Sequence, residues 1–486
     1  MSREPMDGEP LVVGRMVVGR MVVGRMGLRR MGLGRMGLGR MGVGRMGVGR
    51  TPDRKPGLAR LVTLLATALL TACGGGGGGG GTGTSAELQG CSVVEQNQFV
   101  YDTMRDIYYW VEDMPEIDPA DLPSPQAVLD ALRVPQDRFS FLTTQAADDA
   151  FFGDGQFAGM GLRSDQPEPG VLRIVEVFEG SPADRAGLRR GDRVLSVNGR
   201  PIEDVLAVGS FGSAVGPNEV GVEVDLTWRR TDGTEQAATI VKAVVTIPPV
   251  AAVNVLDTAA GPVGYLELRT FVEPAAGPLE DAFGTFKAAG AEQVVIDLRY
   301  NTGGLLSIAR VLADLAGGAG AAGQPFYTQE YNAANSFRNN TALFRNRANS
   351  LAPARVLFIV TSSSASASEM VINGLEPFYD VVLVGEQTLG KPVGQNAIRF
   401  CDLLLRPVSF AVVNALGEGD YFDGLPVDCA AVDDIDTPLG DPAEASLAEA
   451  LHYAENGACS TPADADPAIR AKPTRSTQPW RLLDAD

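Results

Sequence analysis

Histidine is almost missing from this chain, since His452 is the only one among 486 residues. A metal site built from several histidines is therefore excluded, and a serine–histidine–aspartate triad would have to use His452 itself. His452 lies in the segment ALHYAENG, which predicts an ordinary helix near the end of the chain. Any catalytic base in this protein is expected to be a different group.

Positive charge is scarce outside the first residues. The formal net charge is -19, yet residues 1–60 carry about +9, which leaves about -28 on the other 426 residues. An acidic body of this kind argues against nucleic acid or anionic lipid as its partner and favours a soluble protein. The length fits two or three domains of roughly 100–200 residues each.

The first residues look unlike a folded domain. Residues 11–50 are eight pentads of the type VVGRM or MGLGR, and a period of five fits neither a helix nor a strand. A basic membrane-active arm is one interpretation. The other is a start too far upstream, because beginning at Met46 gives a 27-residue leader with basic residues before the apolar run Leu61–Leu70. Ten apolar residues are too few to span a bilayer.

The end of this leader, Leu70-Thr71-Ala72-Cys73, resembles a bacterial lipobox, in which a cysteine becomes the lipidated N-terminus. A plain signal peptide with a coincidental cysteine is the alternative. Eight glycines follow, Gly74–Gly81, and such a run behaves as a flexible tether. We expect residues 1–72 to be the low-complexity leader and signal peptide and 73–90 the tether. The expected location is the periplasmic side of the cell envelope, with the anchor in the outer membrane because Gly74 follows the cysteine.

Four further cysteines remain: Cys91, Cys401, Cys429 and Cys459. An even number in an exported protein predicts two disulfides, and four cysteines allow three pairings. We favour Cys401–Cys429, which closes a moderate loop, with Cys91–Cys459 joining the ends of the folded body. A reactive-thiol enzyme is the competing interpretation.

The folded body divides by pattern into three parts and a tail. Residues 91–154 predict a small helical unit, with an apolar stripe over Gln96–Asp113 and a second helix at Ser124–Arg133. In 155–248 the strand-like Val171–Phe178 precedes SPADRAGLRRGDRVLSVNG, where Ser181-Pro182 signals a helix start. This segment resembles a PDZ domain, which captures a chain terminus on a sheet edge. The resemblance assigns the carboxylate-binding loop to Gly159, Met160, Gly161 and Leu162; a PDZ domain that binds no peptide is the alternative.

Residues 249–456 alternate predicted strands and helices, which indicates an α/β core, and 457–486 predict a disordered tail. The strands are expected at Val263–Phe271, Val294–Leu298, Val356–Val360 and Val381–Gly385. The helices are expected at Pro278–Ala289, Leu306–Gly317 and Ala367–Leu375. Chemistry in such folds collects at the carboxyl ends of the strands.

The stretch TSSSASASEM, Thr361–Met370, lies at such an end. A serine at a strand-to-helix turn presents its hydroxyl beside free helix amides, but it needs a base to become a nucleophile. Lys391 stands 25 residues after Ser366 and can serve only as a neutral amine. Lowering a lysine pKa by ~3 units costs about 4 kcal/mol.

Three motifs in order, IDLRYNTGG, SASASE and VGEQTLGKPVGQ, resemble the C-terminal processing proteases, the tail-specific serine peptidases of the S41 clan. The resemblance covers roughly Cys91–Asn456. It implies Ser366 as nucleophile, Lys391 as general base and Gln395 as the residue that orients the lysine. It also implies an oxyanion hole from the amide of Ala367 and one amide of the pair Gly303-Gly304. The other serines of the stretch are expected to be small spacers.

We therefore expect an exported, lipid-anchored serine endopeptidase of α/β multidomain fold, with no metal or cofactor. Its expected partners are protein or peptide C-terminal tails, with the membrane reached only through the lipid anchor; the sequence identifies neither an adaptor nor an oligomeric state. Pro392 stands where the family usually has glycine, and Tyr300-Asn301-Thr302 vary the residues before the glycine pair. Two alternatives stay open: an inactive PDZ scaffold that binds peptide tails, and an esterase or amidase using the same residues.

Overall fold

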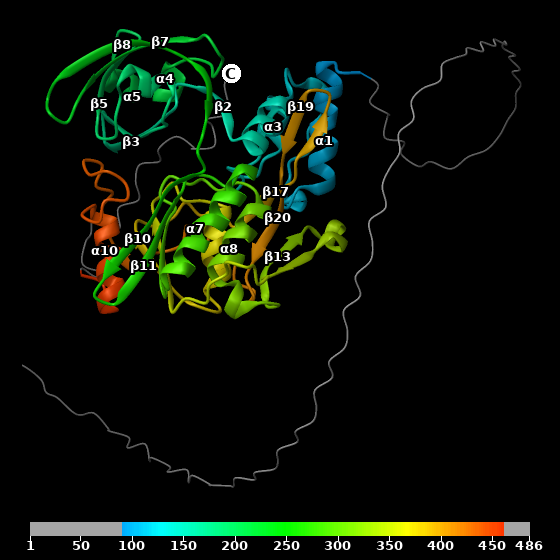
Figure 1. Ribbon diagram of the computed structural model, residues 1–486. Helices are drawn as coiled ribbons and strands as arrows, with labels where there is room; N and C mark the ends of the chain where they lie inside the picture. Colours follow the sequence, from blue (N-terminus) through cyan, green and yellow to red (C-terminus); the bar gives the residue numbers. More distant parts are fainter. Residues whose placement is uncertain (1–89, 461–486) are drawn as a thin grey trace, which may run out of the picture. The chain divides into compact units, whose positions relative to one another are not determined.

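The computed structural model of the chain describes residues 90–460 (Figure 1). The predicted leader, Cys73, nearly all of the glycine tether and most of the predicted tail lie outside the described residues. Within 90–460, no helix has both the length and the apolar character needed to cross a bilayer.

The N-terminal unit packs α1 (Val93–Ile107) against α2 (Pro125–Leu132), and their buried faces share one apolar cluster. Ser92 and Glu95 form a capping box that starts α1. The unit is not purely helical as predicted, because β1 (Phe141–Thr144) pairs antiparallel with β19 (Leu403–Arg406). β19 in turn pairs with β18 (Ile398–Phe400). A four-residue strand with such a distant partner leaves no local signal in the sequence. The other elements of the unit are η1 (Val111–Asp113), η2 (Pro119–Asp121) and α3 (Gln145–Asp154).

The segment predicted to be a PDZ domain has its own apolar core and a sheet with strand order β3-β4-β5-β7-β8. Ser181 caps α4, as the sequence predicted, and Gly187 ends the helix with a φ of 92°. The strands are β2 (Gln156–Gly159), β3 (Leu162–Glu168), β4 (Val171–Val177), β5 (Arg193–Val197), β6 (Arg200–Pro201), β7 (Glu223–Arg229), β8 (Glu235–Val241) and β9 (Ala243–Thr246). The helices are α4 (Pro182–Ala186), α5 (Ile202–Val208) and α6 (Phe211–Ala214).

The core is a six-stranded sheet of order β10-β11-β12-β15-β16-β21, in which every pair except the edge pair β10–β11 is parallel. Alternate strand residues point to opposite faces of the sheet. One set packs with α7, α8 and α9 in one apolar cluster, and the other set packs with α10 in a second cluster. In Figure 1, α7 and α8 lie side by side. The strands are β10 (Val250–Thr258), β11 (Gly261–Leu268), β12 (Gln293–Asp297), β15 (Arg355–Val360), β16 (Asp380–Gly385) and β21 (Cys429–Ala430). The helices are α7 (Ala276–Ala289), α8 (Leu306–Ala321), α9 (Ala367–Leu375) and α10 (Ala445–Asn456).

A smaller antiparallel sheet of order β14-β13-β20-β17 completes the core. Its strands are β13 (Pro325–Tyr331), β14 (Asn340–Leu343), β17 (Val393–Gln395) and β20 (Val408–Val413). Two short helices, η3 (Glu273–Ala275) and η4 (Ala333–Arg338), precede α7 and β14. Because β17 begins two residues after Lys391, this sheet fixes where the lysine loop ends.

The favoured disulfide pairing was wrong. The bonds are Cys91–Cys401 and Cys429–Cys459, with sequence separations of 310 and 30 residues. Cys401 lies in the turn between β18 and β19, a hairpin that packs on the N-terminal unit, so it meets Cys91. Cys429 is in β21 under α10, so it meets the cysteine that follows α10. The spacing of the cysteines along the sequence does not reveal either of these contacts.

Candidate active site

Ser366 lies at the turn between β15 and α9 in a backbone conformation that is unfavourable for a residue with a side chain. Its φ is 56° and its ψ is -113°. Such conformations cost of order 1–3 kcal/mol and persist only where the surroundings hold them. Here the Ser366 N–H donates to Glu369 Oε2 at 2.8 Å, and its carbonyl accepts from Met370 N at 2.8 Å. The first turn of α9 therefore holds the strained residue in place.

Two neighbouring serines do more than act as small spacers, which corrects the prediction. Ser364 and Ser368 are fully buried. Ser364 Oγ donates to Leu298 O at 2.8 Å, and Ser368 Oγ donates to Asn301 O at 2.9 Å. Both acceptors belong to the chain that leaves β12. The two hydroxyls thus join the serine turn to the loop that carries the glycine pair.

The glycine pair packs directly on the serine turn. A Cβ atom at Gly303 would lie 2.8 Å from Ser366 Cβ and 2.9 Å from Ala367 N, so no side chain fits there. The Gly303 N–H already donates to Asn301 Oδ1 at 2.9 Å. In residues 90–460, the N–H groups of Gly304 and Ala367 have no protein acceptor. Of the pair, Gly304 is therefore the residue whose amide is available to a substrate.

Lys391 is bound by the residue predicted to orient it. Its Nζ donates to Gln395 Oε1 at 2.7 Å, while Gln395 Nε2 donates to the carbonyls of Phe139 and Arg406. Burial, with a smaller effect from the nearby Arg406 guanidinium, lowers the pKa of Lys391 to about 8. A sizeable fraction of the amine is therefore neutral near physiological pH.

Ser366 and Lys391 are not hydrogen-bonded to each other in the described part of the chain. Catalytic hydrogen bonds are often long in structures without substrate and shorten when it binds. Pro392 joins the lysine loop to β20, because its carbonyl accepts from Val412 N at 2.9 Å.

Glu369 is the functional residue that sequence reasoning missed. It is fully buried and accepts four hydrogen bonds: from Thr388 Oγ1 and Gly390 N on one oxygen, and from Ser366 N and Lys391 N on the other. Burial raises its pKa, and these donors oppose that rise. A single carboxylate thus holds the backbone of both Ser366 and Lys391. The sequence did contain a signal for this role. In SASE, Glu369 stands three residues after Ser366 at a helix start, which is the pattern of a capping box.

Glu369→Gln is expected to loosen both loops, since an amide cannot accept hydrogen bonds on its nitrogen. We expect the unfolding free energy to fall by about 2–4 kcal/mol, and kcat to fall more than KM rises. Thermal unfolding and peptide kinetics measure the two effects. Glu376→Gln at the other end of α9 is the matched control, and equal behaviour of the two variants would contradict the role given to Glu369.

The loop predicted to bind a peptide carboxylate leads into the outermost strand of its sheet. Gly159 ends β2, and Leu162 begins β3, whose outer edge pairs with no other strand of the described chain. Gly161 has a φ of 82°, and a Cβ there would lie 2.2 Å from Ser181 Cβ. The side chains of Met160 and Leu162 are buried in the domain core. Only their backbone groups can therefore serve a ligand.

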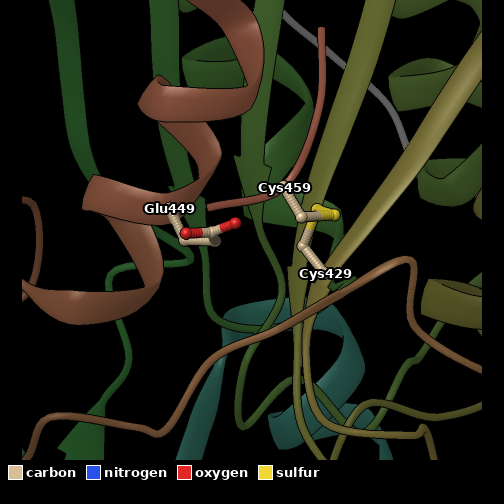
Figure 2. Close-up of side chains that lie close together, drawn as sticks. All are labelled: Cys429, Glu449 and Cys459. Atoms are coloured by element: carbon tan, nitrogen blue, oxygen red, sulfur yellow. A yellow bond between two sulfur atoms is a disulfide. The ribbon is translucent and has the colours of Figure 1, made fainter. Parts of the chain in front are cut away.

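Among residues 90–460, one group of three side chains has metal-ligand chemistry and spacing: Cys429, Glu449 and Cys459. Figure 2 shows the sulfurs of the two cysteines joined to each other beside Glu449. Glu449 is itself occupied, since it accepts from Ser460 N at 2.8 Å. Disulfide sulfurs are not thiolate ligands, so this group does not fit a metal. His452 lies on α10 and contacts Asn456, as an ordinary helix residue does.

Comparison with known proteins gives three matches along the chain: peptidase S41 N-terminal domain over residues 95–141, PDZ domain over 173–224 and peptidase family S41 over 262–415. The carboxyl-terminal-processing protease of Synechocystis sp. is 29% identical over 51% of this chain and 56% of its own length. The carboxy-terminal processing protease CtpA of Bacillus subtilis is 26% identical over 51% of this chain and 50% of its own. The chain thus spans about half the length of these curated relatives.

A solved structure of a Bacteroides fragilis protein assigned to the S41 proteases is similar over 73% of this chain and 96% of its own. The identity is 25% and the TM-score 0.58. The likeness therefore extends over more of the chain than the core alone.

Proposed function

The chain belongs to peptidase family S41, and we propose from this that it is a serine endopeptidase that cleaves protein substrates near their C-terminal tails. The observation that carries the proposal is the packing of Gly303 against Ser366 and Ala367. Within residues 90–460, the amides of Gly304 and Ala367 have no acceptor. Acyl transfer requires a nucleophile beside donors that hold a developing oxyanion. A strained serine at a helix start with two such amides meets that requirement.

In the proposed mechanism, neutral Lys391 accepts the proton of Ser366 as the serine oxygen attacks the scissile carbonyl. The carbonyl oxygen becomes an oxyanion that accepts hydrogen bonds from the amides of Gly304 and Ala367, each typically worth ~3–4 kcal/mol. The lysine returns the proton to the leaving amine, which leaves an acyl-enzyme. Water then gives a proton to the lysine and attacks the ester, and Ser366 is restored. Gln395 orients Nζ through the bond at 2.7 Å.

We assign substrate capture to the PDZ domain. A peptide tail adds along the open edge of β3, and the amides of the segment from Gly159 to Leu162 receive its carboxylate.

For location, we propose that Cys73 is lipidated and that the glycine tether holds the protease at the periplasmic face of the outer membrane. Labelling of cells with a radioactive fatty acid tests the anchor, because Cys73→Ser should remove the label.

Digestion of casein by the full chain, combined with labelling by a fluorophosphonate probe, tests the enzymatic function. We expect peptide products and a probe adduct on Ser366. Small-ester turnover without casein cleavage would instead support an esterase or amidase. Tail-peptide binding with neither activity would support a PDZ scaffold without catalysis.

The pH dependence of casein cleavage follows from the lysine. Only the neutral amine can accept a proton, and its pKa is lowered to about 8. We expect kcat/KM to rise about tenfold per pH unit below that value and to level above it. Measurement from pH 6 to 10, with circular dichroism at each pH to confirm folding, checks this. A rate that is flat across the range would contradict a titrating base.

A further inference from the structure

An open pocket of about 390 Å³ lies beside the lysine loop, and neither the mechanism nor the PDZ domain uses it. Pro392, the residue after Lys391, forms part of its wall, and so does Phe422. The carbonyl of Phe422 packs on Gly390, the residue before Lys391, where a Cβ would lie 2.3 Å from it. The pocket therefore adjoins the chain on both sides of the proposed base.

The walls of the pocket are apolar and partly aromatic. Tyr109 reaches it from the N-terminal unit, and its N–H donates to Val408 O at 2.9 Å, which fixes the tyrosine against β20. With Phe422 and Pro392, Tyr109 gives a surface suited to an aliphatic stem. The face of an aromatic ring also attracts a cation.

The charged side chains of the pocket are all acidic. Glu330, Glu418 and Asp420 line it, and no lysine or arginine does. In the described chain, neither Glu330 nor Asp420 forms an ion pair. Burial raises the pKa of the Tyr109 hydroxyl, and the nearby carboxylates of Glu330 and Asp420 raise it further.

The arrangement of the three carboxylates suits a basic side chain better than a metal ion. The oxygens of the three carboxylates do not gather within 4.8 Å of one another, as the ligands of one ion would. Spread-out carboxylates around an apolar wall instead match a lysine or arginine side chain, whose apolar stem and charged head need different surroundings.

We propose that this pocket is a specificity subsite for a lysine or arginine side chain of the substrate, close to the scissile bond. The inference rests on the proposed endopeptidase function and adds the substrate class. A substrate cation bound in the pocket would also assist the proposed mechanism, because a positive charge near Lys391 lowers the pKa of its amine and favours the neutral form.

Pairs of peptides that differ only in Lys against Gln test the subsite in the full chain. Cleavage sites are first mapped in casein by mass spectrometry, and the exchange is then made at each of the three positions on either side of the bond. We expect one position at which the lysine peptide is cleaved with about tenfold higher kcat/KM. No preference at any position would overturn the inference.

Two pairs of substitutions assign the preference to the pocket. Glu330→Gln with Asp420→Asn should bring the ratio close to one while cleavage of the glutamine peptide is kept. Glu330→Lys with Asp420→Lys should reverse the preference toward a glutamate peptide, an effect that simple loss of stability does not produce. Glu223→Gln with Asp257→Asn changes the net charge equally on β7 and β10 and should leave the ratio unchanged.

A basic preference that survives neutralisation of Glu330 and Asp420, or that the control pair abolishes equally, would contradict the subsite. Cleavage of neither peptide by the wild-type chain would overturn the endopeptidase function, and the subsite with it. Cleavage of both at the same rate would overturn the subsite alone. The two proposals therefore fail in distinguishable ways.

Discussion

Ser366→Ala is expected to lower kcat for peptide hydrolysis by at least about 10⁴-fold, because it removes the oxygen that forms the acyl-enzyme in the proposed mechanism. Peptide binding to the PDZ domain should be unchanged, since that domain has its own core. Initial rates on a cleaved peptide, with thermal unfolding of both proteins, measure the effect.

Ser363→Ala is the matched control, because it makes the same chemical change three residues earlier. In the part of the chain that the structure describes, Ser363 is hydrogen-bonded only through its backbone, whose N–H donates to Thr361 Oγ1 at 3.3 Å. We expect its activity to stay within about twofold of wild type. If hydrolysis persisted in Ser366→Ala and was lost in Ser363→Ala, the nucleophile would be misassigned.

The next largest effect is expected at the base, where both Lys391→Ala and Lys391→Arg should lower kcat by about 10³-fold. Alanine removes the proton acceptor, and arginine keeps a charge that it does not lose at any usable pH. Equal losses in the two variants would indicate that basicity, and not positive charge, is needed. Steady-state kinetics at pH 9, where the wild-type amine is mostly neutral, gives the clearest comparison.

Lys287→Arg is the control for the lysine, because its ammonium donates only to backbone carbonyls near the surface. The double variant Ser366→Ala with Lys391→Ala should be no slower than Ser366→Ala alone, since the two groups act in one step. Additive losses would separate the serine and the lysine into independent roles.

Much of the fold could be predicted from local pattern. The helix predicted at Ala367–Leu375 has the bounds that the structure shows, and the strand predicted at Val356–Val360 begins one residue earlier, at Arg355. Apolar periodicity, caps and turn residues act over a few residues, so a single sequence carries them. Strand β1 of the N-terminal unit could not be predicted in this way, because its partner, β19, lies far along the chain.

At the site, the sequence identified the chemical groups but not their hydrogen bonds. The occupation of the Gly303 amide by Asn301, and the four bonds to Glu369, depend on where three loops meet. The pocket beside Lys391 likewise joins Tyr109, Pro392 and Phe422, which no spacing rule brings together. Such features follow from packing of the whole domain, and only the structure contains them.

The bond between Cys91 and Cys401 has a consequence for how the protein is made. At synthesis rates of about 5–20 residues per second, the first thiol emerges tens of seconds before its partner, which is 310 residues behind. Cys401 and Cys429 emerge almost together and are the nearest candidates to join. Correct maturation therefore requires the N-terminal helices to meet the late hairpin before Cys401 is oxidised together with Cys429.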